Sequence, residues 1–155
     1  MINLSKTTVE DLETLFVFQT DPEANQMAAF TAEDPNDKDA YLKKWTAIVA
    51  NPEIRMETAR FRNEIVGSVA QFVMFGKPMV AYWIDRQHWG KGLATESLKK
   101  FLEGSAVRPL FARIAHDNIG SQRVLEKCGF KVSGKERGFA NARKEEIEEY
   151  EYMLD

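Results

Sequence analysis

The chain has 155 residues, 44% of them hydrophobic, and a net charge of −3, which fits one folded domain over residues 1–155. Its apolar runs are far shorter than the roughly 20 residues of a transmembrane helix, and its N-terminus lacks the apolar core of a secretory signal. The acidic balance provides no basic face for nucleic acid. We therefore expect a cytoplasmic protein, a monomer or homodimer, with no membrane or nucleic-acid partner.

The N-terminal part of the chain is predicted to contain two helices separated by a long loop. Thr7 and Glu10 have the form of a capping box, and apolar residues then recur at helical spacing, which predicts a helix from about Thr8 to Gln19. The polar stretch at residues 21–37 is too long for a simple turn, which makes it a candidate functional loop. Apolar residues from Tyr41 to Val49 then mark a second helix.

Strands and two further helices are predicted for the rest of the chain. The strand patterns lie at residues 56–61, 65–73, 79–84 and 110–115, from Phe130 onward, and around Tyr150–Leu154. Helical patterns cover Leu93–Gly104 and Asn118–Lys127. The first three strands form an antiparallel meander, whereas the strands on either side of the first of these helices should lie parallel.

A turn rich in glycine connects the strand ending at Ile84 to the helix beginning near Leu93. Gly90 and Gly92 can adopt positive φ, and the start of a helix presents free N–H groups and a partial positive charge. This combination favours a pyrophosphate site, although glycines before a helix are often only turn residues. The turn is not a P-loop, because no Ser or Thr follows Lys91 directly, and it lacks the three-glycine dinucleotide pattern.

A second segment carries polar residues at the start of the next helix. Asn118 and Ser121 lie on the same side of its opening turn, close to the end of the strand at residues 110–115. Helix capping is the alternative role for both side chains. Cys128, the single cysteine, follows on the apolar face of this helix, where we expect a core residue.

Together the two segments resemble the GCN5-related N-acetyltransferase (GNAT) superfamily, in particular its ribosomal-protein N-terminal acetyltransferase branch. The family's coenzyme motif, Gln or Arg, two residues, Gly, one residue, Gly or Ala, falls on Trp89, Gly92 and Ala94. Its second motif, an Asn that begins a helix ending in Gly-Phe, matches Asn118 and Gly129-Phe130. The resemblance covers nearly the whole chain. It implies an α/β fold with a mixed, mostly antiparallel sheet, a splayed parallel strand pair and flanking helices.

The resemblance further implies acetyl-CoA as co-substrate and no metal. Backbone groups from Trp89 to Ala94 would bind the pyrophosphate, the strand ending at Ile84 would bind the pantetheine arm together with Asn118, and a basic side chain would meet an outer phosphate. The implied coenzyme-binding residues are Trp83, Ile84, Trp89, Gly90, Lys91, Gly92, Leu93, Ala94, Thr95, Asn118, Ser121 and Arg123.

The sequence departs from the family pattern at two positions. Trp89 replaces the usual Gln or Arg, at a position where backbone makes most phosphate contacts. Leu125 stands where many members have a Tyr that protonates the departing thiolate, so Ser121 becomes the candidate for hydrogen bonding the sulfur. Candidate general bases are His116 and Glu149, together with Glu148, Asp85, Asp21 and Glu23, each of which also has a structural or solvated reading.

The implied reaction is direct attack of a neutral amine on the acetyl thioester, with a small-molecule or peptide amine as acceptor. The segment Met27–Phe30 is expected to shape the acceptor pocket, with plain packing as the alternative. Transfer to a hydroxyl, or transfer of a longer acyl chain, is the alternative chemistry. The absence of Tyr at position 125 also keeps open a catalytically inactive CoA-binding sensor.

Overall fold

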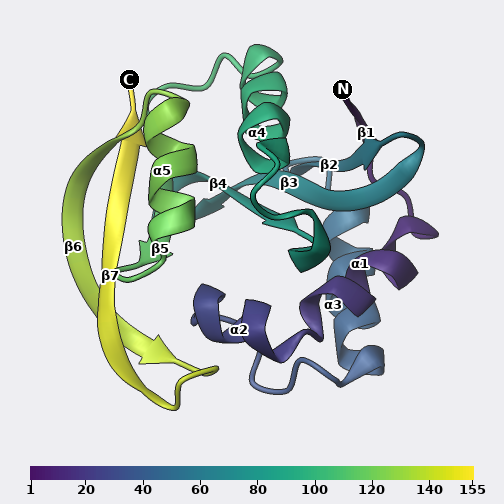
Figure 1. The fold of residues 1–155 in the computed structure, drawn as a ribbon, viewed down its shortest axis with the longest axis horizontal. Coiled ribbons are helices and arrows are strands. Elements are labelled where there is room, and N and C mark those ends of the chain that lie inside the picture. Colours follow the sequence, from purple (N-terminus) through teal and green to yellow (C-terminus); the bar gives the residue numbers. More distant parts are fainter.

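A computed structural model describes residues 1–155 and contains one seven-stranded sheet with helices on both faces (Figure 1). The strands are β1 (Ile2–Lys6), β2 (Arg55–Phe61), β3 (Glu64–Met74), β4 (Lys77–Ile84), β5 (Leu110–Ala115), β6 (Lys131–Ala140) and β7 (Glu145–Leu154). The helices are α1 (Asp11–Gln19), α2 (Pro22–Ala28), α3 (Lys38–Ala50), α4 (Leu93–Glu103) and α5 (Ile119–Lys127), with a short 3₁₀ turn, η1, at Arg86–His88. No helix is both long enough and apolar enough to cross a membrane.

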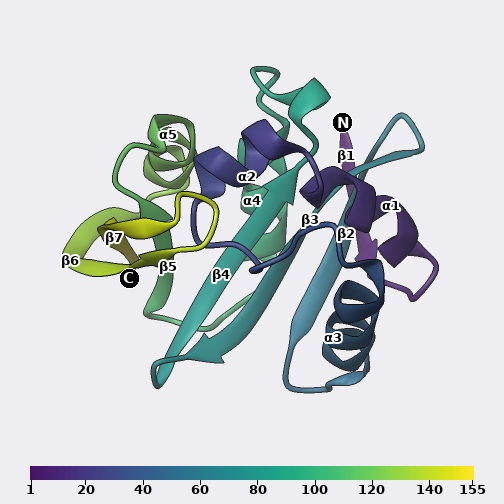
Figure 2. The same ribbon diagram turned by 90° about the horizontal axis from the view of Figure 1, so that it is seen from below.

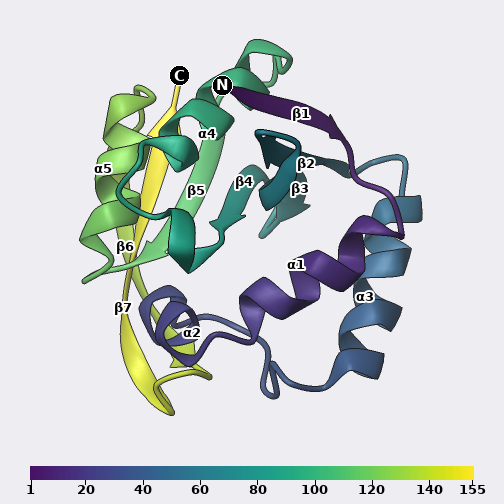
Figure 3. The ribbon, with the colours of Figure 1, turned by 45° about the vertical axis from the view of Figure 1, so that its right-hand side comes forward.

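The sheet has the order β1-β2-β3-β4-β5-β7-β6, and only β4 and β5 run parallel. Figure 3 shows α4 and α5 on one side of it and α1 and α3 on the other. The main core joins Leu98 and Phe101 of α4 to Leu125 of α5 and Leu110 of β5. A smaller cluster holds Leu12 and its neighbours on α1 against β2 and β3. The fold is thus the mixed α/β arrangement that the resemblance implies.

The parallel strands β4 and β5 separate soon after they meet. Their only paired position is Met79 with Phe111, whereas β3 follows β4 along its whole length, from Met74 opposite Lys77 to Gly67 opposite Ile84. The C-terminal half of β4 therefore has a neighbouring strand on one edge only. This confirms the splayed pair, and α2 lies across its open end (Figure 2).

Two elements were missed by the sequence predictions. Strand β1 pairs antiparallel with β2 and buries Ile2 completely, but its five residues carry too few apolar side chains to stand out. Helix α2 lies in the segment interpreted as a loop. Asp21 caps it by accepting a hydrogen bond from Glu23 N–H, and Pro22 occupies its first position. That Asp-Pro start was a readable helix signal.

The predicted capping box at Thr7 and Glu10 is wrong, and α1 begins at Asp11 instead. Thr7 is buried, and Asp11 Oδ2 accepts hydrogen bonds from Thr8 N–H (3.1 Å) and the Thr58 hydroxyl (2.9 Å). Arg60 donates to Asp11 Oδ1 at 2.8 Å. Burial raises the pKa of the Asp11 carboxyl, but these hydrogen bonds and the Arg60 charge outweigh it and hold the pKa below its usual value. This network fixes α1 on the sheet.

Candidate coenzyme-binding site

The glycine turn adopts the expected conformation. Gly90 and Gly92 have φ of 77° and 76°, and α4 begins directly after Gly92, at Leu93. The backbone N–H groups of residues 90–95 donate to no backbone or side-chain acceptor, and the first helical bond runs from Glu96 N–H to Gly92 O. A Cβ at either glycine would meet open space. The turn is therefore a cradle of unpaired donors at a helix N-terminus, the arrangement that binds anions.

Trp89, which replaces the family's Gln or Arg, ties this cradle to the sheet. Its indole Nε1 donates a hydrogen bond to the carbonyl oxygen of Ile84 at 2.8 Å. Asp85 N–H, one residue further on, donates to Val66 O of the neighbouring strand at 2.8 Å. The side chain thus bridges the end of β4 and the turn.

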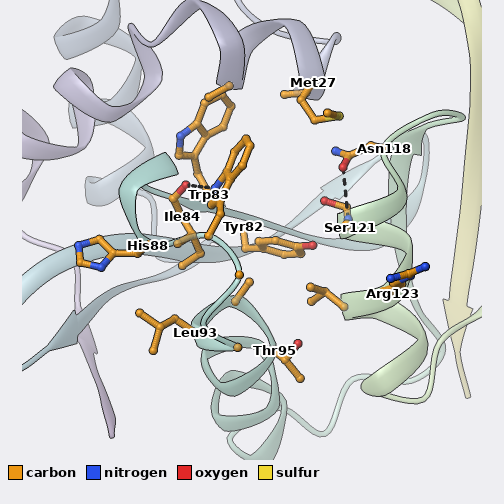
Figure 4. Close-up of a pocket in the computed structure, with 18 of the residues that line it drawn as sticks. Met27, Tyr82, Trp83, Ile84, His88, Leu93, Thr95, Asn118, Ser121 and Arg123 are labelled. Atoms are coloured by element: carbon orange, nitrogen blue, oxygen red, sulfur yellow. Dashed lines mark hydrogen bonds between the residues drawn. The ribbon is translucent and has the colours of Figure 1, made fainter.

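A cavity of about 450 Å³ runs from the cradle past β4 and α5 to α2 (Figure 4). A volume of this size is typical of ligand pockets. Of the predicted coenzyme-binding residues, those that line it are Trp83, Ile84, Trp89, Gly90, Gly92, Leu93, Ala94, Thr95, Asn118, Ser121 and Arg123. Lys91 does not line it. Residues far apart in sequence therefore converge on one cavity at the splay.

Asn118 and Ser121 meet at the start of α5. Asn118 Oδ1 accepts a hydrogen bond from Ser121 N–H at 3.2 Å, so Asn118 does cap the helix. The Asn118 amide nitrogen donates to no group of the protein, and both side chains face the cavity (Figure 4). Capping and ligand contact are therefore compatible, because they use different atoms of the same amide.

Several cavity residues were missed from the sequence. On β4, Tyr82 points toward α5, and its hydroxyl is buried without a geometrically defined hydrogen-bond partner. Burial raises its pKa to about 12, and the Ser121 side chain acts in the opposite direction. The strand alternation of Val80, Tyr82 and Ile84 was the signal for this inward face. The other unanticipated lining residues are Ala24, His88, Gly120, Val124 and Lys127.

Helix α2 forms the end of the cavity opposite the glycine turn. Met27 and two alanines of the same helix line it, and the acceptor role expected for the segment Met27–Phe30 stays a prediction. Phe30 instead packs against a separate cluster that contains Ala115 and Ile147. Helix α2 is held in place from two sides: Arg86 binds Asp21 and Glu23 at its first turn, and Arg143 binds the Gln26 carbonyl and Asp117.

None of the six candidate general bases, His116 and Glu149 included, lines the cavity. His116 joins β5 to α5 through its backbone, donating to Glu148 O and accepting from Gln122 Nε2 at 2.8 Å. Glu149 lies 3.3 Å from Arg113 within a cluster of acidic side chains. Burial raises the pKa of the Glu149 carboxyl, with Arg113 opposing the shift. Of the three predicted catalytic residues, only Ser121 lines the cavity.

Comparisons with known proteins identify relatives of this chain and structures that share its fold. The chain is similar to the uncharacterized N-acetyltransferase p20 of Bacillus licheniformis, 23% identical over 167 residues that cover 99% of this chain and 92% of that protein. Among solved structures, an N-acetyltransferase from Staphylococcus aureus Mu50 superposes with a TM-score of 0.84 at 18% identity, over 100% of this chain and 98% of the other.

Two further structures contain ligands. RimL, a ribosomal L7/L12 alpha-N-protein acetyltransferase in complex with coenzyme A, has a TM-score of 0.78 at 15% identity and covers 99% of this chain and 94% of its own. The microcin C7 self-immunity acetyltransferase MccE, in complex with acetyl-CoA and AMP, gives the same TM-score and identity over 99% and 91%. At such identities these matches show the fold alone. The family model for the acetyltransferase (GNAT) domain matches residues 2–131, and the chain therefore belongs to the GNAT acetyltransferase family.

Proposed function

We propose that the protein transfers the acetyl group of acetyl-CoA to a primary amine by direct attack in a ternary complex. The observation that carries the proposal is the row of free N–H groups at residues 90–95 at one end of a cavity that continues to α2. Acetyl-CoA, whose long pantetheine arm joins the pyrophosphate to the thioester, matches that shape and polarity. Each part of the cofactor then has a counterpart in the protein.

The pyrophosphate binds the cradle, and two cations stand beside it. Arg123 and Lys127, one helical turn apart on α5, line the cavity, and neither forms a salt bridge within the protein. The pantetheine arm follows the free edge of β4, where its amides replace the missing strand. Asn118 donates its free amide N–H to the arm, and Ser121 faces the sulfur. Lys91 is exposed and does not line the cavity, and its contact with an outer phosphate stays a prediction.

In the reaction, the neutral amine nitrogen attacks the thioester carbonyl. The C–N bond forms, the C–S bond breaks, and the sulfur leaves with the electron pair. A thiol with a pKa near ~8.5 is a good leaving group, so a hydrogen bond to the sulfur suffices without a strong acid. The nitrogen gives up one proton, which balances the release of CoA as a thiol. The protein supplies proximity and backbone N–H donors for the carbonyl oxygen.

The acceptor end favours an α-amine over a lysine side chain. The carboxylates beside α2 are paired with Arg86 and Arg143, and the helix presents Met27 and small apolar residues to the cavity. No unpaired carboxylate lines the cavity to deprotonate an ammonium group. At a pH of about 7.4 about a quarter of an α-amine is neutral, against about one in a thousand for a lysine amine. We therefore propose a peptide N-terminus or a small α-amino compound. A role of His116 or Glu149 as general base stays a prediction.

The test is thiol release from acetyl-CoA with matched acceptors. We expect turnover with peptides that carry a free α-amine, and little with the same peptides blocked at the N-terminus but carrying a lysine. An alcohol acceptor and a longer acyl-CoA address the two alternative chemistries. The inactive-sensor alternative is favoured by Leu125, which is 1% exposed in the core and offers no hydroxyl. CoA binding without thiol release across the panel would establish that alternative.

A further inference from the structure

The cavity contains an unexplained buried hydroxyl, that of Tyr82. Its ring leaves β4 on the face toward α4 and α5, and it packs against the main core. The oxygen atom has almost no exposed surface and no hydrogen-bond partner within the usual geometric limits. A buried hydroxyl without a partner destabilises a protein, so its presence calls for a functional explanation.

The Tyr82 hydroxyl points toward the first turn of α5, where Ser121 faces the same cavity (Figure 4). The backbone N–H of Ser121 is already used by Asn118, but its side-chain oxygen is bonded to no group by the same geometric criteria. A serine hydroxyl has one proton to donate and two lone pairs to accept with. An isolated serine can therefore rotate its proton away from a ligand, whereas a donor on the opposite side restricts that rotation.

We propose that Tyr82 is a positioning residue whose hydroxyl donates to Ser121 Oγ and thereby turns the serine proton toward the sulfur of the bound acyl-CoA. This inference depends on the proposed function, because it needs the sulfur beside Ser121. In this proposal a tyrosine on β4 assists the departing sulfur, whereas many family members have a tyrosine for that purpose at the position of Leu125. The Leu125 side chain is buried in the core and has no hydroxyl to donate.

Tyr82 acts as a donor and not as an acid. Its pKa of about 12 keeps the phenol protonated throughout the physiological range. It also lies well above the pKa of a thiol, near ~8.5, so transfer of the phenol proton to a thiolate is uphill. When the C–S bond breaks, the sulfur keeps the electron pair, and the Ser121 proton stabilises the new charge. The proton that completes CoA comes from the acceptor nitrogen, so both hydroxyls end the cycle unchanged.

The test measures the pKa of the CoA thiol while CoA is bound. Thiolate absorbance is titrated in the wild type, Tyr82→Phe, Ser121→Ala and the double variant. The same titration with desulfo-CoA, which has no thiol, is subtracted for each protein to remove the absorbance of Cys128 and the tyrosines. We expect the Tyr82→Phe substitution to raise the bound thiol pKa by about one unit and to lower kcat about tenfold, with KM for acetyl-CoA within about twofold. Adding Tyr82→Phe to Ser121→Ala should change nothing further.

Tyr41→Phe is the matched control, because Tyr41 is also a largely buried tyrosine whose pKa is raised to about 12, but it lies on α3 away from the cavity. Difluorotyrosine at position 82 is the second variant if Tyr82→Phe does not fold. As a stronger donor, it should shift the thiol pKa downward. A wild-type thiol pKa in Tyr82→Phe, or an equal shift in Tyr41→Phe, overturns the inference. Failure of the wild type to bind CoA at all overturns the proposed function instead.

Discussion

Replacing Gly92 by aspartate or by asparagine separates charge from shape at the proposed pyrophosphate cradle. Gly92 has φ of 76° and ψ of 7°, and a Cβ built on it meets no other atom within 4 Å. Either side chain therefore projects into the open cradle without a clash. Both carry the strain of a left-handed backbone, about 1–2 kcal/mol, which Asn and Asp tolerate better than most residues. The two variants differ by one negative charge.

The size of the expected effect follows from Coulomb's law. Two unit charges about 4 Å apart repel by ~1 kcal/mol in bulk water and by ~4 kcal/mol at the effective dielectric constant near a protein surface. The cradle opens to solvent on one side, so we take an intermediate value of about 3 kcal/mol for the carboxylate against the pyrophosphate. This corresponds to a roughly hundredfold difference in Kd between the aspartate and asparagine variants.

The assay is isothermal titration of CoA into the wild type and both variants, with urea unfolding to show that the two variants are equally stable. We expect Gly92→Asn to bind CoA more weakly than the wild type and Gly92→Asp to bind about a hundredfold more weakly again. The gap between the variants should narrow as salt is added. Equal Kd values for the two variants at low salt would show that the phosphates do not bind at this turn.

Three other substitutions test the surroundings of the site. Asp11→Ala removes the acceptor of a buried network and should lower the unfolding free energy by about 2–4 kcal/mol. Because the pKa of Asp11 in the folded protein lies below its usual value of 3.8, the difference in unfolding free energy between the wild type and the variant should be largest above pH 3.8 and shrink as the pH falls through the folded pKa. A free-energy difference that grows in acid would contradict this role of Asp11. Gly67→Ala places a Cβ 2.0 Å from the Trp83 carbonyl oxygen, so urea unfolding should show a loss of about 3 kcal/mol or more, and wild-type stability would refute that packing. Arg143→Met releases α2 and should raise KM for the amine several-fold without changing the Kd of CoA, whereas unchanged amine kinetics would show that this arginine does not order the acceptor end.

The parts of the site that could be predicted from the sequence are those set by local backbone chemistry. Gly90 and Gly92 need positive φ, Asn118 caps a helix, and Gly129, with φ of 94°, ends one. Each of these requirements involves only residues close in sequence. The order of strands and helices from β2 to β7 followed from apolar periodicity for the same reason. Their combination is specific enough to point to one family from the amino-acid sequence alone.

The features that sequence reasoning missed depend on contacts between distant segments. Arg86 binds Asp21 across 65 positions, and Arg143 binds Asp117 across 26, so neither pairing that holds α2 is visible in a local pattern. The burial of the Tyr82 hydroxyl likewise arises only when α5 packs beside β4. Strand β1 was missed because its stability comes from pairing with β2, which follows much later in the chain. Tertiary packing decides these cases, and local propensity does not.

The most direct test of the central claim is a crystal structure of the protein with acetyl-CoA. We expect the pyrophosphate within hydrogen-bond distance of the N–H groups of residues 90–95, the pantetheine arm along the free edge of β4, and the sulfur beside Ser121. The acetyl group should point toward α2. Acetyl-CoA bound on another face of the molecule, or in this cavity with its phosphates away from the glycine turn, would contradict the assignment of the site.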